Sequence, residues 1–176
     1  MFMKRFRMHF LFILIFLFCY KNAWAKDQCH IQEVIDLSVF KKNDYKLFNY
    51  TCSSEQGETL KNYIGNSNKK VFVNEYFDFA AKESPKLLAV SIYQPKTKKT
   101  PLLITLHTSY YCCTPQIEGS SYEVNLYQID KNMKLTELTG LLDEDSEGFE
   151  GQVEGRIYYR FKDIASIKRW LDKNYK

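Results

Sequence analysis

Residues 102–113 read LLITLHTSYYCC. Apolar and polar side chains alternate through this stretch with a period of two, which is typical of a β-strand that buries one face. The alternation runs into two adjacent cysteines, Cys112 and Cys113. Because successive side chains of a strand point to opposite faces, we expect these two cysteines to lie on opposite sides of a sheet.

Stretches with the same period of two lie on both sides of this strand and predict further strands. They comprise residues 71–79, 88–93, 122–129, 135–138 and 156–161. In the last of these, Ile157, Tyr159 and Phe161 are expected to be buried. Residues 31–40 mix helical and alternating spacing, so the sequence leaves their structure open.

A short helix is predicted after Cys52. Ser53 and Gln56 have the spacing of a capping box. Leu60 and Ile64 then fall on one helical face, and Gly65 follows where a C-terminal cap is expected. This pattern predicts a helix over residues 54–64.

A second helix is predicted at the C-terminus. Asp163 suits an N-cap, and the apolar residues behind it are spaced as one face of an amphipathic helix. Strands in succession with short connections, and helices near the ends, favour an α+β fold. We therefore expect a mainly antiparallel β-sheet of about five to six strands, a short helix in the N-terminal half, a C-terminal amphipathic helix and disulfide staples.

The first 25 residues have the organisation of a secretory signal peptide. Lys4, Arg5 and Arg7 precede an apolar run, and Ala23-Trp24-Ala25 places small residues at the two positions that a signal peptidase reads. The apolar run is shorter than the ~20 residues of a spanning helix, which makes an uncleaved anchor the weaker interpretation. We expect cleavage after residue 25, one globular domain over residues 26–176, and a periplasmic or secreted location without stable membrane insertion.

Four cysteines follow the signal segment: Cys29, Cys52, Cys112 and Cys113. An even number of cysteines behind an export signal predicts a disulfide framework, and four cysteines allow three pairings. We favour two long bridges that fasten Cys29 and Cys52 to the 112–113 pair, over a vicinal bridge. Redox catalysis is the weaker alternative, because the sequence contains no Cys-x-x-Cys motif.

The formal net charge of +4 comes from the four cations of the signal segment, so the remainder is neutral. A neutral chain gives no electrostatic reason to expect nucleic-acid binding. The charge is nevertheless uneven, with ten acidic residues against two lysines between Glu118 and Glu154. This segment is either an ordinary solvated surface or an acidic patch that meets a cationic partner.

Residues 143–154 read DEDSEGFEGQVE and place acids at positions 1, 3, 5 and 12 with glycine at position 6. This order resembles an EF-hand calcium loop, in which Asp143, Asp145, Glu147 and Glu154 would be the metal ligands. Glu150 departs from the apolar residue usual at position 8, and a strand is predicted after the loop in place of a helix. An acidic surface loop without Ca²⁺ is therefore the leading interpretation, and no other cofactor is expected.

No nucleophile elbow, metal-binding histidine pair or nucleotide fingerprint occurs in the sequence. His107 shares a strand face with Thr105 and Ser109, but no nearby acid has the spacing needed to orient its imidazole. We expect a structural role for His107 and a chain that is not an enzyme. Carboxylates that are distant in sequence and converge only in the fold are the exception.

In size, export signal and lack of a catalytic motif the chain resembles the small exported inhibitors and immunity proteins of Gram-negative bacteria. The leading hypothesis is a periplasmic binding protein that neutralises a partner enzyme or a basic toxin. Alternatives are a calcium-binding envelope domain and an envelope hydrolase. The expected contact residues lie in the acidic loop: Asp143, Glu144, Asp145, Glu147, Phe149 and Glu150.

Overall fold

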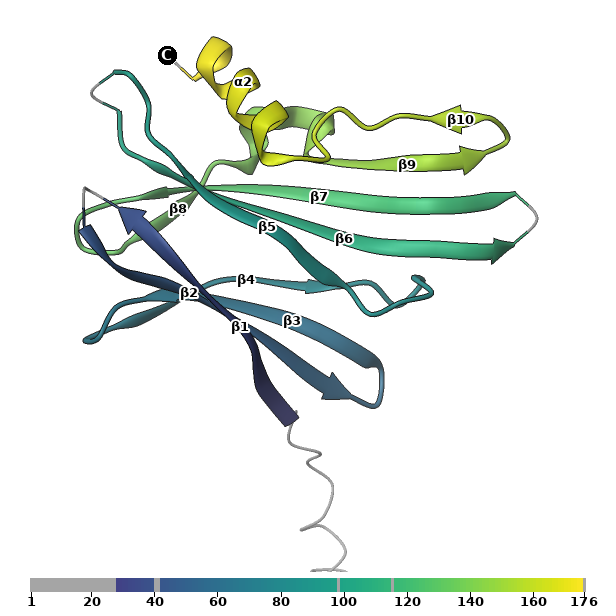
Figure 1. Ribbon diagram of the computed structural model, residues 1–176, viewed down its shortest axis with the longest axis horizontal. Helices are drawn as coiled ribbons and strands as arrows, with labels where there is room; N and C mark the ends of the chain where they lie inside the picture. Colours follow the sequence, from purple (N-terminus) through teal and green to yellow (C-terminus); the bar gives the residue numbers. More distant parts are fainter. Residues whose placement is uncertain (1–27, 40–41, 98, 115, 176) are drawn as a thin grey trace, which may run out of the picture.

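The computed structural model describes residues 28–39, 42–97, 99–114 and 116–175. These residues form two antiparallel sheets, one 3-10 helix and one α-helix (Figure 1). The predicted signal segment lies outside the described residues. In the part of the chain that the structure describes, no helix has the length and apolar character needed to span a membrane.

The N-terminal sheet, sheet A, is a four-stranded meander in which each strand pairs with the next along the chain. Its β2–β3 and β3–β4 connections are tight turns. Gly57, at a φ of 127°, follows the two-residue turn between the second and third strands. The Asn66 side chain accepts from the amides of Asn68 and Lys69 in the next turn. The strands are β1 (Gln28–Val39), β2 (Lys42–Ser54), β3 (Gly57–Gly65) and β4 (Lys70–Phe77).

The C-terminal sheet, sheet B, has the strand order β10-β9-β7-β6-β5, and β8 pairs with the C-terminal part of β7, on the same edge as β9. Its centre is the long β6–β7 hairpin, which contains the alternating stretch 102–113. The strands are β5 (Lys86–Tyr93), β6 (Leu102–Thr114), β7 (Ile117–Ile129), β8 (Leu135–Glu137), β9 (Glu147–Val153) and β10 (Arg156–Ile157). The 3-10 helix η2 (Thr139–Ser146) connects β8 to β9.

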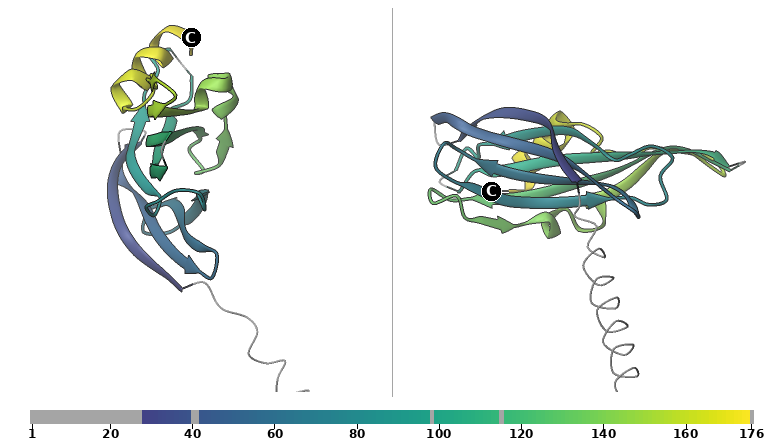
Figure 2. Two further views of the ribbon diagram at one scale, coloured as in Figure 1. Left: turned by 90° about the vertical axis from the view of Figure 1, so that its right-hand side faces the viewer. Right: turned by 90° about the horizontal axis from the view of Figure 1, so that it is seen from below.

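The molecule has three layers, with sheet B in the middle (Figures 1 and 2). Sheet A packs on one face of sheet B, where Leu47 and Ile64 of sheet A meet Leu103 of β6. The C-terminal helix α2 (Ile164–Asn174) packs over the other face, against residues such as Ile104. The alternation along β6 therefore supplies both cores, because each face of this strand is buried.

The C-terminal helix begins where the sequence predicts. The Asp163 carboxylate accepts from the amide of Ser166 at 2.7 Å and so caps the first turn. Ile167 and Leu171 are fully buried, which confirms the predicted apolar face. The mainly antiparallel architecture with helices is likewise consistent with the predicted α+β class.

The predicted helix over residues 54–64 is wrong, because this segment forms the β2–β3 turn and strand β3. The Ser54 hydroxyl accepts from the Gln56 amide at 3.2 Å, which stabilises a hairpin turn and not a helix start. Leu60 and Ile64 are both buried on one strand face. A spacing of four residues fits a strand as well as a helix, and the polar Asn62 between them concealed the alternation.

The fold also contains more strands than the expected five to six, and they form two sheets instead of one. In the segment whose structure the sequence leaves open, residues 31–39 belong to β1. The predicted strand at 156–161 is shorter than expected, because β10 ends at Ile157. Tyr159 and Phe161 are buried as predicted, whereas Ile157 is 41% exposed.

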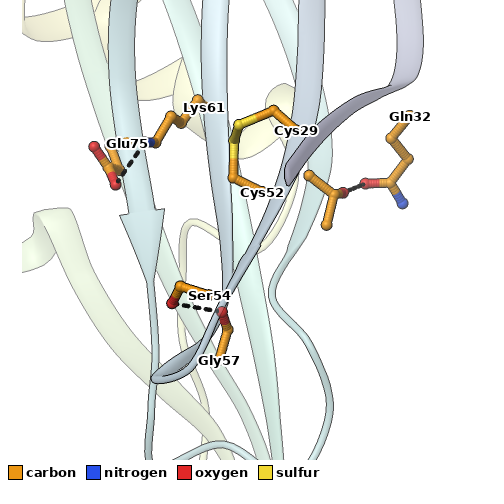
Figure 3. The surroundings of a disulfide bond; sticks show 8 residues. Cys29, Gln32, Cys52, Ser54, Gly57, Lys61 and Glu75 are labelled. Atoms are coloured by element: carbon orange, nitrogen blue, oxygen red, sulfur yellow. Dashed lines mark hydrogen bonds and ion pairs between the residues drawn. A yellow bond between two sulfur atoms is a disulfide. The ribbon is translucent and has the colours of Figure 1, made fainter. Parts of the chain in front are cut away.

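All four cysteines of the described residues are paired, but the favoured long bridges are wrong. The bridges join Cys29 to Cys52 and Cys112 to Cys113. Cys29 and Cys52 lie directly opposite each other on β1 and β2 (Figure 3). Cys112 and Cys113 lie near the tip of the β6–β7 hairpin, which extends away from sheet A (Figure 1). The sequence did not show that β1 and β2 pair, and this pairing decides the connectivity.

Peptide mapping tests this connectivity directly. Under non-reducing conditions we expect one pair of peptides joined through Cys29 and Cys52, because strand register places them opposite each other. A single peptide should carry both Cys112 and Cys113 with two hydrogens fewer than its reduced form. A peptide that links either of the first two cysteines to either of the last two would contradict the structure.

Candidate functional site

The β6–β7 hairpin and β9 extend beyond the end of sheet A (Figures 1 and 2). The surface of sheet B that faces sheet A is therefore left uncovered at this end. A cleft of about 460 Å³ lies there, between the end of β4 and strands β6, β7 and β9. Its lining residues are Tyr76, Phe77, Asp78, Tyr111, Ser121, Tyr122, Glu123, Glu147, Gly148 and Phe149. We refer to it as the acidic cleft.

The acidic cleft carries three carboxylates and no cation among its lining residues. Asp78 follows β4, while Glu123 and Glu147 are directly paired across β7 and β9. Burial raises the pKa of the Glu123 carboxyl, and the neighbouring charge of Glu147 raises it further. Two adjacent acids in a partly buried position attract a cation, which would relieve their mutual repulsion.

A chain of amide side chains holds Glu123 in place from behind. Asn62 donates to Asn74 at 2.9 Å, Asn74 donates to Asn125 at 2.7 Å, and Asn125 donates to the Glu123 carboxylate at 2.9 Å. The chain crosses from sheet A to sheet B. Hydrogen bonding by Asn125 favours the ionised carboxylate and opposes the effect of burial on the Glu123 pKa.

His107 lies at the inner end of this amide chain. Its Nε2 is 2.9 Å from the Asn62 amide nitrogen, so Nε2 accepts and the proton of the neutral ring is on Nδ1. The ring is fully buried and stacks on Tyr76, with centroids 4.9 Å apart. Burial lowers the pKa of His107 to about 4. A neutral, inaccessible imidazole agrees with the expected structural role.

Tyr111 closes one side of the acidic cleft. Its hydroxyl donates to the Asp78 carboxylate at 2.5 Å and so ties β6 to the segment after β4. Burial raises the pKa of Tyr111 to about 12, and the hydrogen bond to Asp78 adds to this effect. The phenol is therefore a hydrogen-bond donor throughout the physiological pH range.

Phe149 forms an aromatic wall, supported by a close approach of two strands. Gly119 on β7 and Gly151 on β9 lie directly opposite each other. A Cβ at Gly119 would be 2.7 Å from the Gly151 Cα and 2.7 Å from the Phe149 ring. The ring thus covers the glycine pair and contacts Tyr111 edge to face, at a centroid distance of 6.1 Å.

The structure divides the predicted contact residues. Glu147 and Phe149 line the acidic cleft. Glu150 points to the other face of β9 and pairs with Lys162 at 2.6 Å. Asp145 pairs with Arg160. Asp143 and Glu144 are exposed in η2, outside the cleft lining.

The four candidate calcium ligands are not gathered around one point. Asp143 and Asp145 belong to η2, Glu147 begins β9, and Glu154 follows the extended β9 strand. A calcium loop must instead wrap its ligands around the ion. No cluster of three or more histidine, cysteine or acidic side chains suited to a metal occurs among the described residues. Calcium binding through these residues stays a prediction, which a calcium titration of thermal stability tests.

The sequence did not indicate Asp78, Tyr111 or Glu123 as site residues. One signal for them was available: Glu123 and Asn125 fall on the same strand face as Tyr127 and Ile129. Acidic and amide side chains on a face that is otherwise apolar indicate either a polar seam or a site. Glu123 and Asp78 line the same cleft only because the two sheets pack together, and no local sequence pattern indicates this.

No family model, curated protein or solved structure matches the chain. The chemistry that the site can perform is therefore inferred from the residues of the site alone. Carboxylates beside aromatic faces suit an ammonium or guanidinium group, because charge attraction and cation–π contacts act together. Tyrosine and phenylalanine also provide the rigid contact area that protein interfaces favour.

Proposed function

We propose that the mature chain is an exported periplasmic protein that binds and occludes a basic partner, either an enzyme or a toxin. One observation carries the proposal: the acidic cleft combines Asp78, Glu123 and Glu147 with aromatic walls and has no cation among its described lining residues. A lysine or arginine side chain of the partner would fill it. The projecting β6–β7 hairpin would add contact area beside the cleft.

The charge of the cleft predicts how the complex forms. Complementary charge mainly accelerates encounter, whereas buried aromatic contacts supply most of the affinity. Association should therefore slow as salt rises, because added ions screen charge over a Debye length of about 10 Å at 0.1 M. Dissociation should depend more on Phe149 and Tyr111.

The experiment uses the mature chain to capture its partner from periplasmic extract at low salt, followed by affinity measurements with the purified partner. Glu123→Gln combined with Glu147→Gln should weaken binding roughly thirtyfold or more, because removing one side of a desolvated charge pair costs about 2 kcal/mol or more. Glutamine keeps the shape of each side chain and the acceptor for Asn125.

Asp143→Asn combined with Glu144→Gln is the matched control. It removes the same charge from η2, outside the cleft, and should change affinity little. If both double variants weaken binding equally, the cleft is not the contact site. If no protein is retained at low salt, the function as an inhibitor is wrong.

A second candidate function is favoured by the pairing of Glu123 with Glu147 across two strands. Two neighbouring carboxyls, of which Glu123 has a raised pKa, resemble the acid pair of glycoside hydrolases. An envelope polysaccharide would be the substrate of this alternative. Release of reducing ends from peptidoglycan by the mature chain, abolished by Glu123→Gln, would favour the hydrolase over the inhibitor.

A further inference from the structure

The outer face of sheet A carries a second hollow, remote from the acidic cleft. Sheet A is an outer layer, and no other described element packs on this face (Figure 1). A groove of about 360 Å³ runs across β2, β3 and β4 beside the Cys29–Cys52 bridge. This volume lies within the range of about 300–1,000 Å³ that is usual for small-molecule sites.

Three aromatic rings from adjacent strands form the apolar surface of the groove. Tyr50, Tyr63 and Phe72 follow one another across β2, β3 and β4, and neighbouring rings meet edge to face at 5.5 Å. Phe72 is 48% exposed although it is fully apolar. A row of this kind presents apolar area to a ligand without rearrangement of the protein.

Lys70 provides a positive charge at this surface. Its ammonium lies 3.7 Å from the centre of the Phe48 ring and donates to the Tyr50 hydroxyl at 3.2 Å. Neither partner is an anion, and Lys70 forms no ion pair among the described residues. The other lysine of the groove, Lys61, is 3.7 Å from the Glu75 carboxylate (Figure 3). The charge of Lys70 is thus held at the groove without a counter-ion.

We propose that this groove binds a small amphipathic anion. The apolar body of the ligand lies against Tyr50, Tyr63 and Phe72, and its carboxylate, sulfonate or phosphate accepts from Lys70. The hollowed shape of the groove favours a free small molecule over a flat membrane surface. The site is independent of the acidic cleft, which has the opposite charge.

Two fluorescent probes with nearly the same aromatic body test this proposal. One is 8-anilinonaphthalene-1-sulfonate, and the other is N-phenyl-1-naphthylamine, which lacks the sulfonate. We expect the sulfonate probe to bind the folded mature chain saturably at one site. Lys70→Gln should weaken this probe about five- to tenfold, as expected for loss of a partly exposed charge-assisted hydrogen bond, and leave the neutral probe unchanged.

Phe72→Ala should weaken both probes, because it removes a wall that both of them contact. Lys99→Gln is the matched control for the charge, since Lys99 also lies over an aromatic ring, that of Tyr175, at 4.5 Å. Tyr158→Ala is the control for an exposed aromatic ring elsewhere. Each exchanged side chain lies on the surface, and unchanged thermal midpoints will show that the variants fold.

Three results would overturn the proposal. Equal affinity for the two probes, with no effect of Lys70→Gln, would show that the groove does not recognise an anionic group. Loss of probe binding as the protein concentration and the molecular mass rise together would show that a second copy covers the groove. Co-sedimentation with phosphatidylglycerol vesicles, abolished by Lys70→Gln, would identify a membrane surface as the occupant.

Discussion

Gly119→Ala is expected to lower the free energy of unfolding by about 3 kcal/mol, at the upper end of the usual cost of overpacking. The added Cβ would run into the Glu150 carbonyl oxygen and lie 2.7 Å from the Gly151 Cα. Both obstacles are backbone atoms, so no side-chain rotation removes the clash. Strands β7 and β9 must separate, and the Phe149 wall of the acidic cleft moves with them.

Urea denaturation, followed by tyrosine and tryptophan fluorescence, measures this effect through the shift in midpoint at constant slope. Gly140→Ala is the matched control, because a Cβ at Gly140 meets no atom within 4 Å. Its stability should change by less than about 0.5 kcal/mol. Equal midpoints for the two variants would show that β7 and β9 do not approach as closely as the structure indicates.

The same variant separates stability from binding. If the acidic cleft binds a basic partner, Gly119→Ala should weaken this complex even at temperatures where the variant is folded, because Phe149 no longer lies beside Tyr111. Binding of the sulfonate probe at the outer groove of sheet A should remain. The two sites can therefore be lost separately.

The sequence predicts strands best where burial imposes a regular alternation. Residues 104–109 alternate because Ile104 and Leu106 face the core under α2, while the polar side chains next to them face buried polar partners on sheet A. The terminal helix was equally clear, since the Asp163 cap and the buried Ile167 and Leu171 agree. In both cases local pattern and tertiary environment impose the same structure.

Prediction failed where a buried polar residue interrupts the pattern. Asn62 is fully buried between Leu60 and Ile64, on the face of sheet A that packs on sheet B. Its side-chain amide forms hydrogen bonds with Asn74 and His107, which lie on other strands. Its partners come from distant parts of the sequence, so the position looks polar and exposed when the sequence is read alone. The disulfide prediction failed for a related reason. Cys29 and Cys52 are joined because β1 pairs with β2, and no local pattern in the sequence indicates that these two strands pair.

The candidate site was predicted only in part for the same reason. Glu147 and Phe149 were recognised because they lie in a locally acidic segment. Asp78 follows β4, Tyr111 is on β6 and Glu123 is on β7. They meet because sheet A ends short of the β6–β7 hairpin. Strand lengths and sheet packing are global properties, which no short motif encodes.

The mature chain is expected to lose about 3 kcal/mol of unfolding free energy through His107 as the pH falls from 7 to 4. Burial lowers the pKa of this imidazole from 6.5 to about 4 in the folded chain. Between these values the unfolded chain binds a proton at His107 and the folded chain does not. The contribution of His107 to the unfolding free energy is therefore fully present above pH 6.5 and is lost progressively as the pH decreases towards 4.

The contacts of His107 explain why the folded chain resists protonation. The imidazolium would carry a proton on Nε2, which faces the Asn62 amide nitrogen, so two donors would oppose each other. Glu123, which pairs with His107 across β6 and β7, acts in the opposite sense. Its raised pKa lets the folded chain bind a proton more readily than the unfolded chain, which offsets part of the loss at low pH.

His107→Gln isolates the histidine contribution, because glutamine retains an acceptor for Asn62 without titrating in this range. The loss of stability between pH 7 and 4 should shrink by about 3 kcal/mol in this variant, whatever its stability at pH 7. His30→Gln is the matched control for the exchange itself, since His30 is exposed on β1. An NMR titration of the His107 ring with a midpoint near 6.5 would contradict this account, because a buried imidazole that faces a donor cannot protonate as readily as a free one.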